Sequence, residues 1–380
     1  MSPAPGASGP LVSLLLPNRD NARVLGVVLD RLARNTTYPR TELVAVDDGS
    51  TDGSIEILRG WADSARIPGF QLIEQEHAGA IAALNAGLAV ASGEVVVQLD
   101  ADASVETPGW IERMLGLLML DESVGVVSAK VVIDSGVLHA CGVDVVGPEG
   151  LHDRLTRITE PVGRRTWHQR VERFAEGTTQ QEHRVAEVDA GIGCCMMYRR
   201  ADALAAGGYD AGFSPVWFDD IDLCLGIRLG GKKVFYTPDV RVLHRLGVRE
   251  AATEPGRGPR ASAVGRARRV ASRAGSGWPA ARAALARGMG LNRPPEAHRD
   301  RLRHHYAYWL EKWGWDPLNP NMDEVRRRYG DSELCWSLDP GRRAAGEAIV
   351  ERFERNRDVS SAEERDRAAA QGYRRASTRS

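Results

Sequence analysis

The first 130 residues alternate between short apolar runs and amphipathic segments, and this alternation restricts the fold more than any other feature of the sequence. Four apolar runs have the length of strands: 11–17, 42–48, 71–75 and 94–100. Segments between them, such as 21–35 and 78–91, place apolar residues at helical spacing. Near-continuous apolar strands separated by helices are typical of a parallel sheet covered on both faces. We therefore predict an α/β fold whose ligands bind beyond the carboxyl ends of the strands.

Carboxylates gather where two of these strands end. Asp47 and Asp48 close the second strand, and Asp100 and Asp102 follow the fourth in VVVQLDADAS. Paired carboxylates repel each other and must stay hydrated or bind a cation. An Asp-x-Asp pair offers the oxygen ligands that suit Mg²⁺ or Mn²⁺, although aspartate is also common in a solvated turn. From the sequence, both a cation site and a solvated turn are compatible with these carboxylates.

A third acidic cluster, FDDIDLCLGIRLGG at 218–231, opens a predicted helix. Asp219, Asp220 and Asp222 lie where the helix dipole favours negative charge, but three acids in four residues exceed what capping needs. Carboxylates this close raise one another's pKa, which suits a general base. His244 follows a predicted strand and is a structural histidine unless it shares a site with Asp102.

Composition limits the class of protein. The chain has 380 residues, 43% hydrophobic and 27% charged, with a formal net charge of −1, which argues against a nucleic-acid partner. Arginines concentrate in 249–303, which permits peripheral contact with an anionic membrane surface. We see neither a signal peptide nor a transmembrane stretch of about 18 apolar residues. Five scattered cysteines predict reduced thiols and therefore a cytoplasmic location. This prediction includes a location at the inner face of the membrane.

Seven segments, in order and spacing, resemble glycosyltransferase family 2: LLLPNRDNARVL, VDDGSTD, EHAGAIAALNAGL, QLDADA, GIGCCMMYRRADALAAGGYD, WFDDIDLCLGIRLGG and YTPDVRVLH. The resemblance implies the GT-A fold, a Rossmann-like, mostly parallel sheet flanked by helices that binds nucleotide sugars. We expect five parts: a disordered N-terminus (1–10), a nucleotide-sugar-binding half (11–130) and an acceptor half (131–246) of one catalytic domain (11–246), an Arg/Ala-rich connection (247–297) and a helical C-terminal extension (298–380).

The resemblance also implies roles for individual residues. For nucleotide-sugar binding it implies Pro17, Asn18, Asp47, Asp48, Gly79, Asn85 and Asp100. For the cation, Mn²⁺ or Mg²⁺, it implies Asp102, His244 and Asp100. The implied catalytic base is Asp220, and the implied acceptor side contains Asp219, Asp222, Trp217 and Gly193. Leu84 stands where members often carry an arginine, and Cys194 and Cys195 are expected to be small packing residues.

The implied reaction is a metal-dependent inverting transfer of a sugar from a nucleotide diphosphate sugar to a hydroxyl group. UDP is the first expectation for the nucleotide, with GDP or dTDP as further candidates. The acceptor is a glycan, a lipid-linked molecule, a natural product or a protein. Trp309, Trp313 and Trp315 either pack in the core or stack on an acceptor sugar, and the tail that carries them can also serve a homo-oligomer interface.

Rival functions differ in what the sequence should contain. A processive polysaccharide synthase would add membrane helices and a Gln-x-x-Arg-Trp motif, which are absent. A nucleotidyltransferase would carry a Gly-rich phosphate loop where this chain has PNRDNARVL. The alternative that remains is a catalytically degenerate GT-A domain that binds a nucleotide or glycan. An adaptor for anionic surfaces, using the arginines of 249–303, is a further class.

Overall fold

The computed structural model describes residues 9–64, 66–67, 69–134, 136–147, 152–153, 156–160, 170–173, 176, 180–245 and 296–357. The predictions for the first eight residues, for 247–295 and for 358–380 lie outside these ranges. The chain forms two compact units, one of them Leu246–Gly314 and the other Met1–Arg245 together with Trp315–Ser380. The sheet and the candidate site belong to the second unit, and helix α10 (Glu296–Trp313) belongs to the first.

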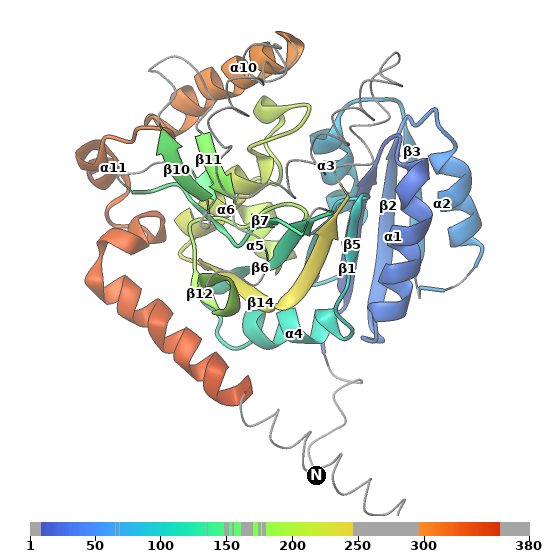
Figure 1. Ribbon diagram of the computed structural model, residues 1–380, viewed down its shortest axis with the longest axis horizontal. Helices are drawn as coiled ribbons and strands as arrows, with labels where there is room; N and C mark the ends of the chain where they lie inside the picture. Colours follow the sequence, from blue (N-terminus) through green and yellow to red (C-terminus); the bar gives the residue numbers. More distant parts are fainter. Residues whose placement is uncertain are drawn as a thin grey trace, which may run out of the picture. The chain divides into compact units, whose positions relative to one another are not determined.

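The main sheet has the strand order β12-β14-β6-β13-β4-β1-β2-β3, with β5 beside β14 and β7 beside β6 (Figure 1). Its strands are β1 (Val12–Asn18), β2 (Thr41–Asp48), β3 (Phe70–Gln75), β4 (Val95–Leu99), β5 (Ala103–Val105), β6 (Val124–Ile133), β7 (Leu138–Ala140), β12 (Ala186–Glu187), β13 (Cys195–Arg199) and β14 (Lys233–His244). Two small sheets pair β8 (Val143–Asp144) with β9 (His152–Asp153), and β10 (Thr156–Glu160) with β11 (Arg170–Arg173).

The α-helices of this unit are α1 (Ala22–Asn35), α2 (Ser54–Ala62), α3 (Ala80–Val90), α4 (Trp110–Leu118), α5 (Arg200–Ala205), α6 (Asp219–Leu229), α11 (Met322–Tyr329) and a helix over 340–357. Three short 3₁₀ helices are η1 (Gln181–His183), η2 (Ala211–Phe213) and η3 (Glu333–Leu338). The helices that follow the first three strands lie where the apolar periodicity predicts them. In the described part of the chain, the C-terminal region is helical, as expected.

Strand direction confirms a mixed, mostly parallel sheet. The run β3-β2-β1-β4 is parallel throughout, and β14 is parallel to β6. Strand β13 is antiparallel to both β4 and β6, so it joins the two parallel groups without reversing their common direction. The carboxyl ends of β1, β2, β4, β6 and β14 therefore point toward one edge of the sheet. This edge is where the predicted site residues must meet.

One segment differs from its sequence-based prediction. The sequence of residues 185–200 is strand-like along its length, but the segment forms two strands in different places, β12 beside β14 and β13 beside β4. Between the two strands, the buried carboxylate of Asp189 accepts hydrogen bonds from the backbone N–H groups of Val145 and Val146, both at 2.7 Å. After Asp189, Ala190 forms an isolated bridge with Val143, and residues 191–194 form a loop at the carboxyl end of β4.

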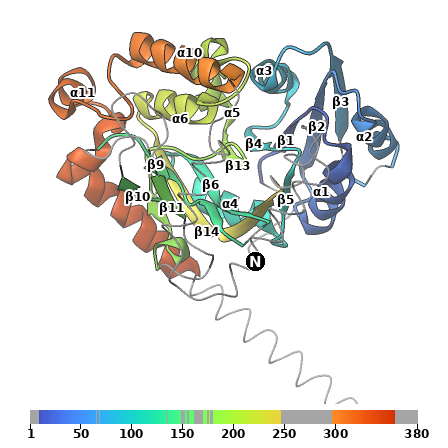
Figure 2. The same ribbon diagram turned by 45° about the horizontal axis from the view of Figure 1, so that its top comes forward.

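The two faces of the sheet bury alternate residues of each strand, as the pleat requires. Leu14 and Val97 belong to the core cluster that includes residues of α1 and α4, and Ile349 and Phe353 join it from the helix over 340–357. On the other face, Leu15 lies directly beneath Gly87 of α3. Figure 2 shows α3, α5 and α6 on one side of the strands and α1 and α4 on the other.

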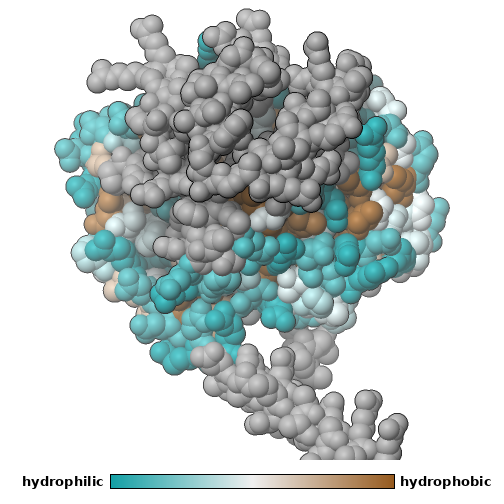
Figure 3. Space-filling model, in the orientation of Figure 1, coloured by the Kyte–Doolittle hydropathy of each residue, from teal (hydrophilic) through white to brown (hydrophobic). Residues whose placement is uncertain are grey.

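The surface of the described residues is mostly hydrophilic on the face that Figure 3 shows, with hydrophobic patches between the polar areas. All five cysteines are buried, and none of them forms a disulfide. Trp309, Trp313 and Trp315 are each no more than 3% exposed, so these rings are buried, as expected for packing aromatics. Among the described helices, none combines the length and the apolar character that crossing a membrane requires.

Candidate active site

Strand pairing brings His244 next to the Asp-x-Asp pair. Strand β4 ends at Leu99, and Asp100 and Asp102 follow before β5 starts at Ala103. Strand β14 is antiparallel to β5, and its last residue, His244, lies opposite Ala103. Residues separated by more than 140 positions in the sequence are therefore held together by the backbone of the sheet, and not by a flexible loop.

The side chains of Asp100, Asp102 and His244 converge. Nε2 of His244 lies 3.1 Å from Oδ1 of Asp102 and 3.9 Å from Oδ2 of Asp100. One ligand atom from each of the three residues falls within 4.8 Å of the other two. The Asp102 side chain is 2% exposed, whereas that of Asp100 is 34% exposed. The cluster thus has a buried carboxylate, a buried imidazole and a carboxylate that faces outward.

Asp220 lies at the start of α6 and contacts the loop before β13. Its Oδ2 accepts a hydrogen bond from the backbone N–H of Gly193 at 2.8 Å, and its Oδ1 accepts one from that of Ile221 at 2.8 Å. Burial raises the pKa of Asp220 and outweighs these two donors, and the charge of Asp100 raises it further. A Cβ on residue 193 would lie 2.4 Å from Nε2 of Gln98, so a larger residue there would have to displace the Gln98 side chain.

The other predicted acceptor-side residues surround Asp220. Asp219 is buried, and its pKa is raised by burial and then by the charge of Asp220. Its Oδ1 accepts a hydrogen bond from the backbone N–H of Trp217 at 2.9 Å. Asp222 is also buried. Trp217 and Phe218 have φ angles of 84° and 66°, a strained conformation for large side chains, so α6 begins directly after a sharp turn.

Asp48 organises the loop that leads into α3. Its carboxylate accepts four hydrogen bonds of 2.7 to 2.9 Å, from the side chains of Gln75 and His77 and from the backbone N–H groups of Ala78 and Gly79. Burial alone would raise the pKa of Asp48, but these donors outweigh it and the pKa is lowered. The carboxylate therefore stays ionised and shapes the edge of the sheet beyond β2.

Asp47 is held in a similar way. It accepts hydrogen bonds from Nδ2 of Asn18 at 2.8 Å, from Oγ of Ser50 at 2.6 Å and from the Ser50 backbone N–H at 3.0 Å. Asn18 and Asp47 lie opposite each other in the parallel pairing of β1 and β2, and Pro17 precedes them opposite Val46. These residues line the carboxyl ends of β1 and β2 as predicted, with their polar groups already hydrogen-bonded to each other.

Gly79 and Asn85 connect α3 to the segment before α6. Gly79 has a φ of 101°, and a Cβ there would lie 2.7 Å from Cβ of Pro215. The Asn85 side chain donates to the backbone carbonyl of Tyr209 at 2.6 Å and accepts from the Tyr209 N–H at 3.0 Å. Both residues therefore fix the position of the chain that leads to Asp220.

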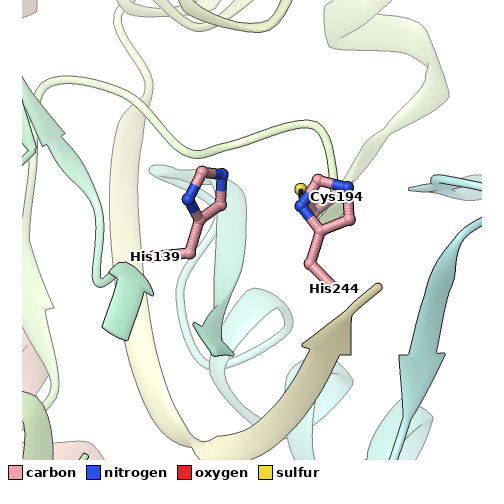
Figure 4. Close-up of side chains that lie close together, drawn as sticks. All are labelled: His139, Cys194 and His244. Carbon is pink, nitrogen blue, oxygen red and sulfur yellow. Dashed lines mark hydrogen bonds between the residues drawn. The ribbon is translucent and has the colours of Figure 1, made fainter. Parts of the chain in front are cut away.

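The sequence reasoning missed two neighbours of His244. Sγ of Cys194 lies 3.2 Å from Nδ1 of His244, and the ring of His139 lies edge-on to that of His244 with centroids 5.3 Å apart (Figure 4). Burial, with the charges of Asp100 and Asp102, raises the pKa of the Cys194 thiol. Nothing in the spacing of residues 139, 194 and 244 indicates this cluster, because only the strand pairings bring them together.

A separate cavity of about 530 Å³ is lined by Gln180, His183, Arg184, Val185, Val350, Glu354 and Arg357. None of these residues was a predicted site residue, and none belongs to the acidic clusters described above. The site is therefore identified by its chemistry and not by the size of a cavity.

The α/β sheet thus carries at its carboxyl edge two carboxylates and an imidazole whose ligand atoms lie close to one another, and the aspartates at the start of α6 lie beside them. Residues 13–204, half of the chain, match the family model described as Glycosyl transferase family 2. The chain belongs to this family, and the resemblance drawn from the seven sequence segments is confirmed.

Curated relatives match about three fifths of the chain. The chain is 29% identical over 237 residues to the uncharacterized protein y4gI of Sinorhizobium fredii, a match that spans 62% of this chain and 24% of that protein. It is 28% identical over 243 residues to the O-antigen biosynthesis protein RfbC of Myxococcus xanthus, covering 62% and 17%. It is 29% identical over 249 residues to validoxylamine A glucosyltransferase of Streptomyces hygroscopicus subsp. limoneus, covering 60% and 50%. The chain thus spans half or less of each of these relatives.

Among solved structures, the mannosyltransferase PcManGT from Pyrobaculum calidifontis, in complex with GDP-Man and Mn²⁺, is similar with a TM-score of 0.46 and 23% identity. That similarity covers 81% of this chain and 83% of the mannosyltransferase. GalNAc-T7 with UDP, GalNAc and Mn²⁺ is similar with a TM-score of 0.48 and 18% identity, covering 62% and 44%.

Proposed function

We propose that this protein is a metal-dependent inverting glycosyltransferase of the hexosyltransferase type. It moves a sugar from a nucleotide diphosphate sugar to a hydroxyl group of a glycan, lipid-linked, natural-product or protein acceptor. UDP is the first candidate for the nucleotide, followed by GDP and dTDP. The observation that carries this proposal is the convergence of Asp100, Asp102 and His244 beside Asp220 in a chain of this family.

The ligand cluster fits a divalent cation. Two carboxylates and an imidazole are within reach of one ion, and the burial of Asp102 beside His244 favours a positive charge there. Oxygen-rich donors suit Mg²⁺ or Mn²⁺, and the imidazole nitrogen favours Mn²⁺ of the two. When bound, the cation would offset the negative charge of the departing nucleoside diphosphate. Asp102 and His244 would hold it, and the more exposed Asp100 would face the donor.

Asp220 would act as the general base. The backbone N–H groups of Gly193 and Ile221 fix the orientation of its carboxylate. Its raised pKa makes it a stronger base than an exposed aspartate while leaving it ionised near neutral pH. Asp220 would take the proton from the acceptor hydroxyl as that oxygen attacks the anomeric carbon. A single displacement of this kind requires no enzyme nucleophile.

Most of the remaining predicted residues would shape the two substrate pockets, whereas Gly79 and Asn85 would act indirectly by fixing the chain that leads to Asp220. Asn18, Asp47 and Asp48 form a hydrogen-bonded rim at the ends of β1 and β2, where the nucleoside would bind. Trp217 and Gly193 flank Asp220 on the acceptor side. Five buried cysteines that form no disulfide support the reducing cytoplasm as the place of action.

A binding experiment tests the donor and the cation together. We would measure thermal unfolding of the full chain with UDP, GDP, dTDP or CMP, each with and without Mn²⁺. A ligand at about one hundred times its dissociation constant adds roughly 2.7 kcal/mol to the unfolding free energy. We expect one diphosphate to stabilise the wild type only with Mn²⁺, and Asp102→Asn to abolish this shift. Asp63→Asn, an exposed aspartate, is the control.

A turnover experiment separates an enzyme from a degenerate binding module. Wild type and Asp220→Asn would each be incubated with a donor sugar that carries the diphosphate found to stabilise the protein. Release of the nucleoside diphosphate would then be measured. Removal of a general base lowers kcat by about 10² to 10⁴, whereas donor binding by Asp220→Asn should persist. Equal rates in the two proteins would refute the role of Asp220, and binding without any turnover by the wild type would favour the binding module.

A further inference from the structure

His244 has a second set of neighbours on its other ring nitrogen. Nε2 faces the carboxylates, whereas Nδ1 lies 3.2 Å from Sγ of Cys194. A nitrogen of His139 completes a second group, in which one ligand atom from each residue lies within 4.8 Å of the others. Figure 4 shows that these three side chains come from separate segments of the chain. His244 therefore lies between two ligand clusters of different composition.

The second cluster has donors of a different chemical character. One thiolate and two imidazoles suit zinc and similar borderline cations and disfavour Mg²⁺. In a tetrahedral site, with Zn–S of about 2.3 Å and Zn–N of about 2.0 Å, sulfur and nitrogen lie roughly 3.5 Å apart. The observed separation of 3.2 Å between Cys194 and His244 is close to this value. His139 would supply the third ligand, because one of its ring nitrogens lies within 4.8 Å of the other two ligand atoms.

We propose that His139, Cys194 and His244 form a binding site for a zinc-class divalent cation, distinct from the carboxylate site. On binding, the Cys194 thiol loses its proton to the solvent, and the cation takes Nδ1 of His244. His139 is only partly buried, so the cluster can be reached from its side. The site requires no nucleotide, and it stands or falls independently of the proposed transferase activity.

The two sites compete for one residue. A neutral imidazole has one N–H group and one nitrogen lone pair, so His244 can ligate through Nε2 or through Nδ1, but not through both without losing a second proton. A zinc-class cation bound through Nδ1 leaves a proton on Nε2, which then faces Asp102 as a donor. Soft-cation binding therefore weakens binding at the carboxylate site, and by linkage the reverse holds equally. This consequence, unlike the site itself, rests on the proposed function.

The site is tested with Co²⁺ as a spectroscopic substitute for zinc, added to the full chain without nucleotide. We expect a thiolate-to-cobalt charge-transfer band that saturates at one equivalent in wild type and in the control Cys195→Ser, whose thiol is the adjacent buried one. The band should disappear in Cys194→Ser and should need at least roughly tenfold more Co²⁺ in His139→Gln. Asp102→Asn should retain it.

Each outcome decides the proposal. A wild type without the band, or a band that survives in Cys194→Ser, overturns it. If Cys194→Ser does not fold, His139→Gln carries the test, since an unchanged Co²⁺ affinity in that variant also overturns the site.

Competition is measured from the electron paramagnetic resonance signal of free Mn²⁺. One equivalent of Zn²⁺ should weaken Mn²⁺ binding at least roughly tenfold more in wild type than in Cys194→Ser, where only direct exchange of the two cations at the carboxylate site remains. A Co²⁺ band without any Mn²⁺ binding would refute the proposed catalytic cation and retain the soft site. Normal Mn²⁺ binding without a Co²⁺ band would do the opposite.

Discussion

Replacing Arg228 with methionine tests how the C-terminal segment is joined to the helix that carries Asp220. Arg228 is fully buried near the end of α6. Its guanidinium donates to the backbone carbonyls of Asp189, Val188 and Glu333 and to the carboxylate of Glu187 at 3.1 Å. Methionine keeps most of the apolar stem and removes every donor, so the change isolates the polar contacts.

The expected loss of unfolding free energy arises from the buried carboxylate of Glu187, which the substitution leaves without Arg228. Removing one partner of a buried ion pair destabilises a protein by about 3 to 5 kcal/mol, because the other charge stays buried. Here Nζ of Lys233 remains 3.6 Å from Glu187, so we expect about 3 kcal/mol, the lower end of that range. Burial already raises the pKa of Glu187. Neutralising it in the double variant Arg228→Met with Glu187→Gln should therefore recover at least about 1 kcal/mol.

The assay is urea unfolding followed by tryptophan fluorescence. Trp336 is a local reporter, since the Arg228 guanidinium lies 5.3 Å from its ring centroid. The control is Arg327→Met, whose side chain is 74% exposed in its ion pair with Glu324 and should cost less than about 1 kcal/mol. A single variant as stable as this control, or a double variant no more stable than the single one, would refute the reasoning.

Three further predictions concern the site and its frame. The pH profile of kcat should fall on its acidic side at a pH above the roughly 4 of an exposed aspartate, because a general base must be ionised and burial raises the pKa of Asp220, the proposed base; an acidic limb at or below that value argues against this proposed role. Gly79→Ala should lower the unfolding free energy by about 1 to 3 kcal/mol in urea melts, since it combines a positive φ with a clash against Pro215. Asn85→Ala should lower it by about 2 kcal/mol through the loss of both contacts with the Tyr209 backbone, with donor affinity unchanged; the opposite pattern would assign Asn85 to the nucleotide.

The N-terminal half was predictable because its signals are local. Apolar runs with helical segments between them set β1 to β4 and α1 to α3 within a few residues, and parallel pairing then puts Asn18, Asp47 and Asp100 at one edge. The same reasoning finds strand character in residues 185–200 but does not separate β12 from β13. Whether an apolar segment is one strand or two depended on Asp189, whose buried contacts with a distant backbone leave no local pattern.

The site was only partly predictable for the same reason. Asp102 and His244 were placed together by the family resemblance, and the pairing of β14 with β5 supplies the physical cause. His139 and Cys194 carry no comparable signal, because their approach to His244 depends on the register of β7 and of the loop before β13. Likewise, the four donors that surround Asp48 come from residues 75–79. No pattern in the sequence indicates that the backbone of this segment turns toward Asp48.

Family membership does not by itself explain how this site is built. The family match ends at residue 204, whereas Asp220 and His244 follow it. The positions of Asp220 and His244 are therefore set by elements that follow the matched region. His244 is positioned by the long strand β14, and Asp220 by a helix whose opposite end is held through Arg228 to Glu333 of η3. The segment after residue 315 therefore belongs structurally to the unit that carries the site, and truncating the chain at residue 245 should loosen α6 and impair Asp220.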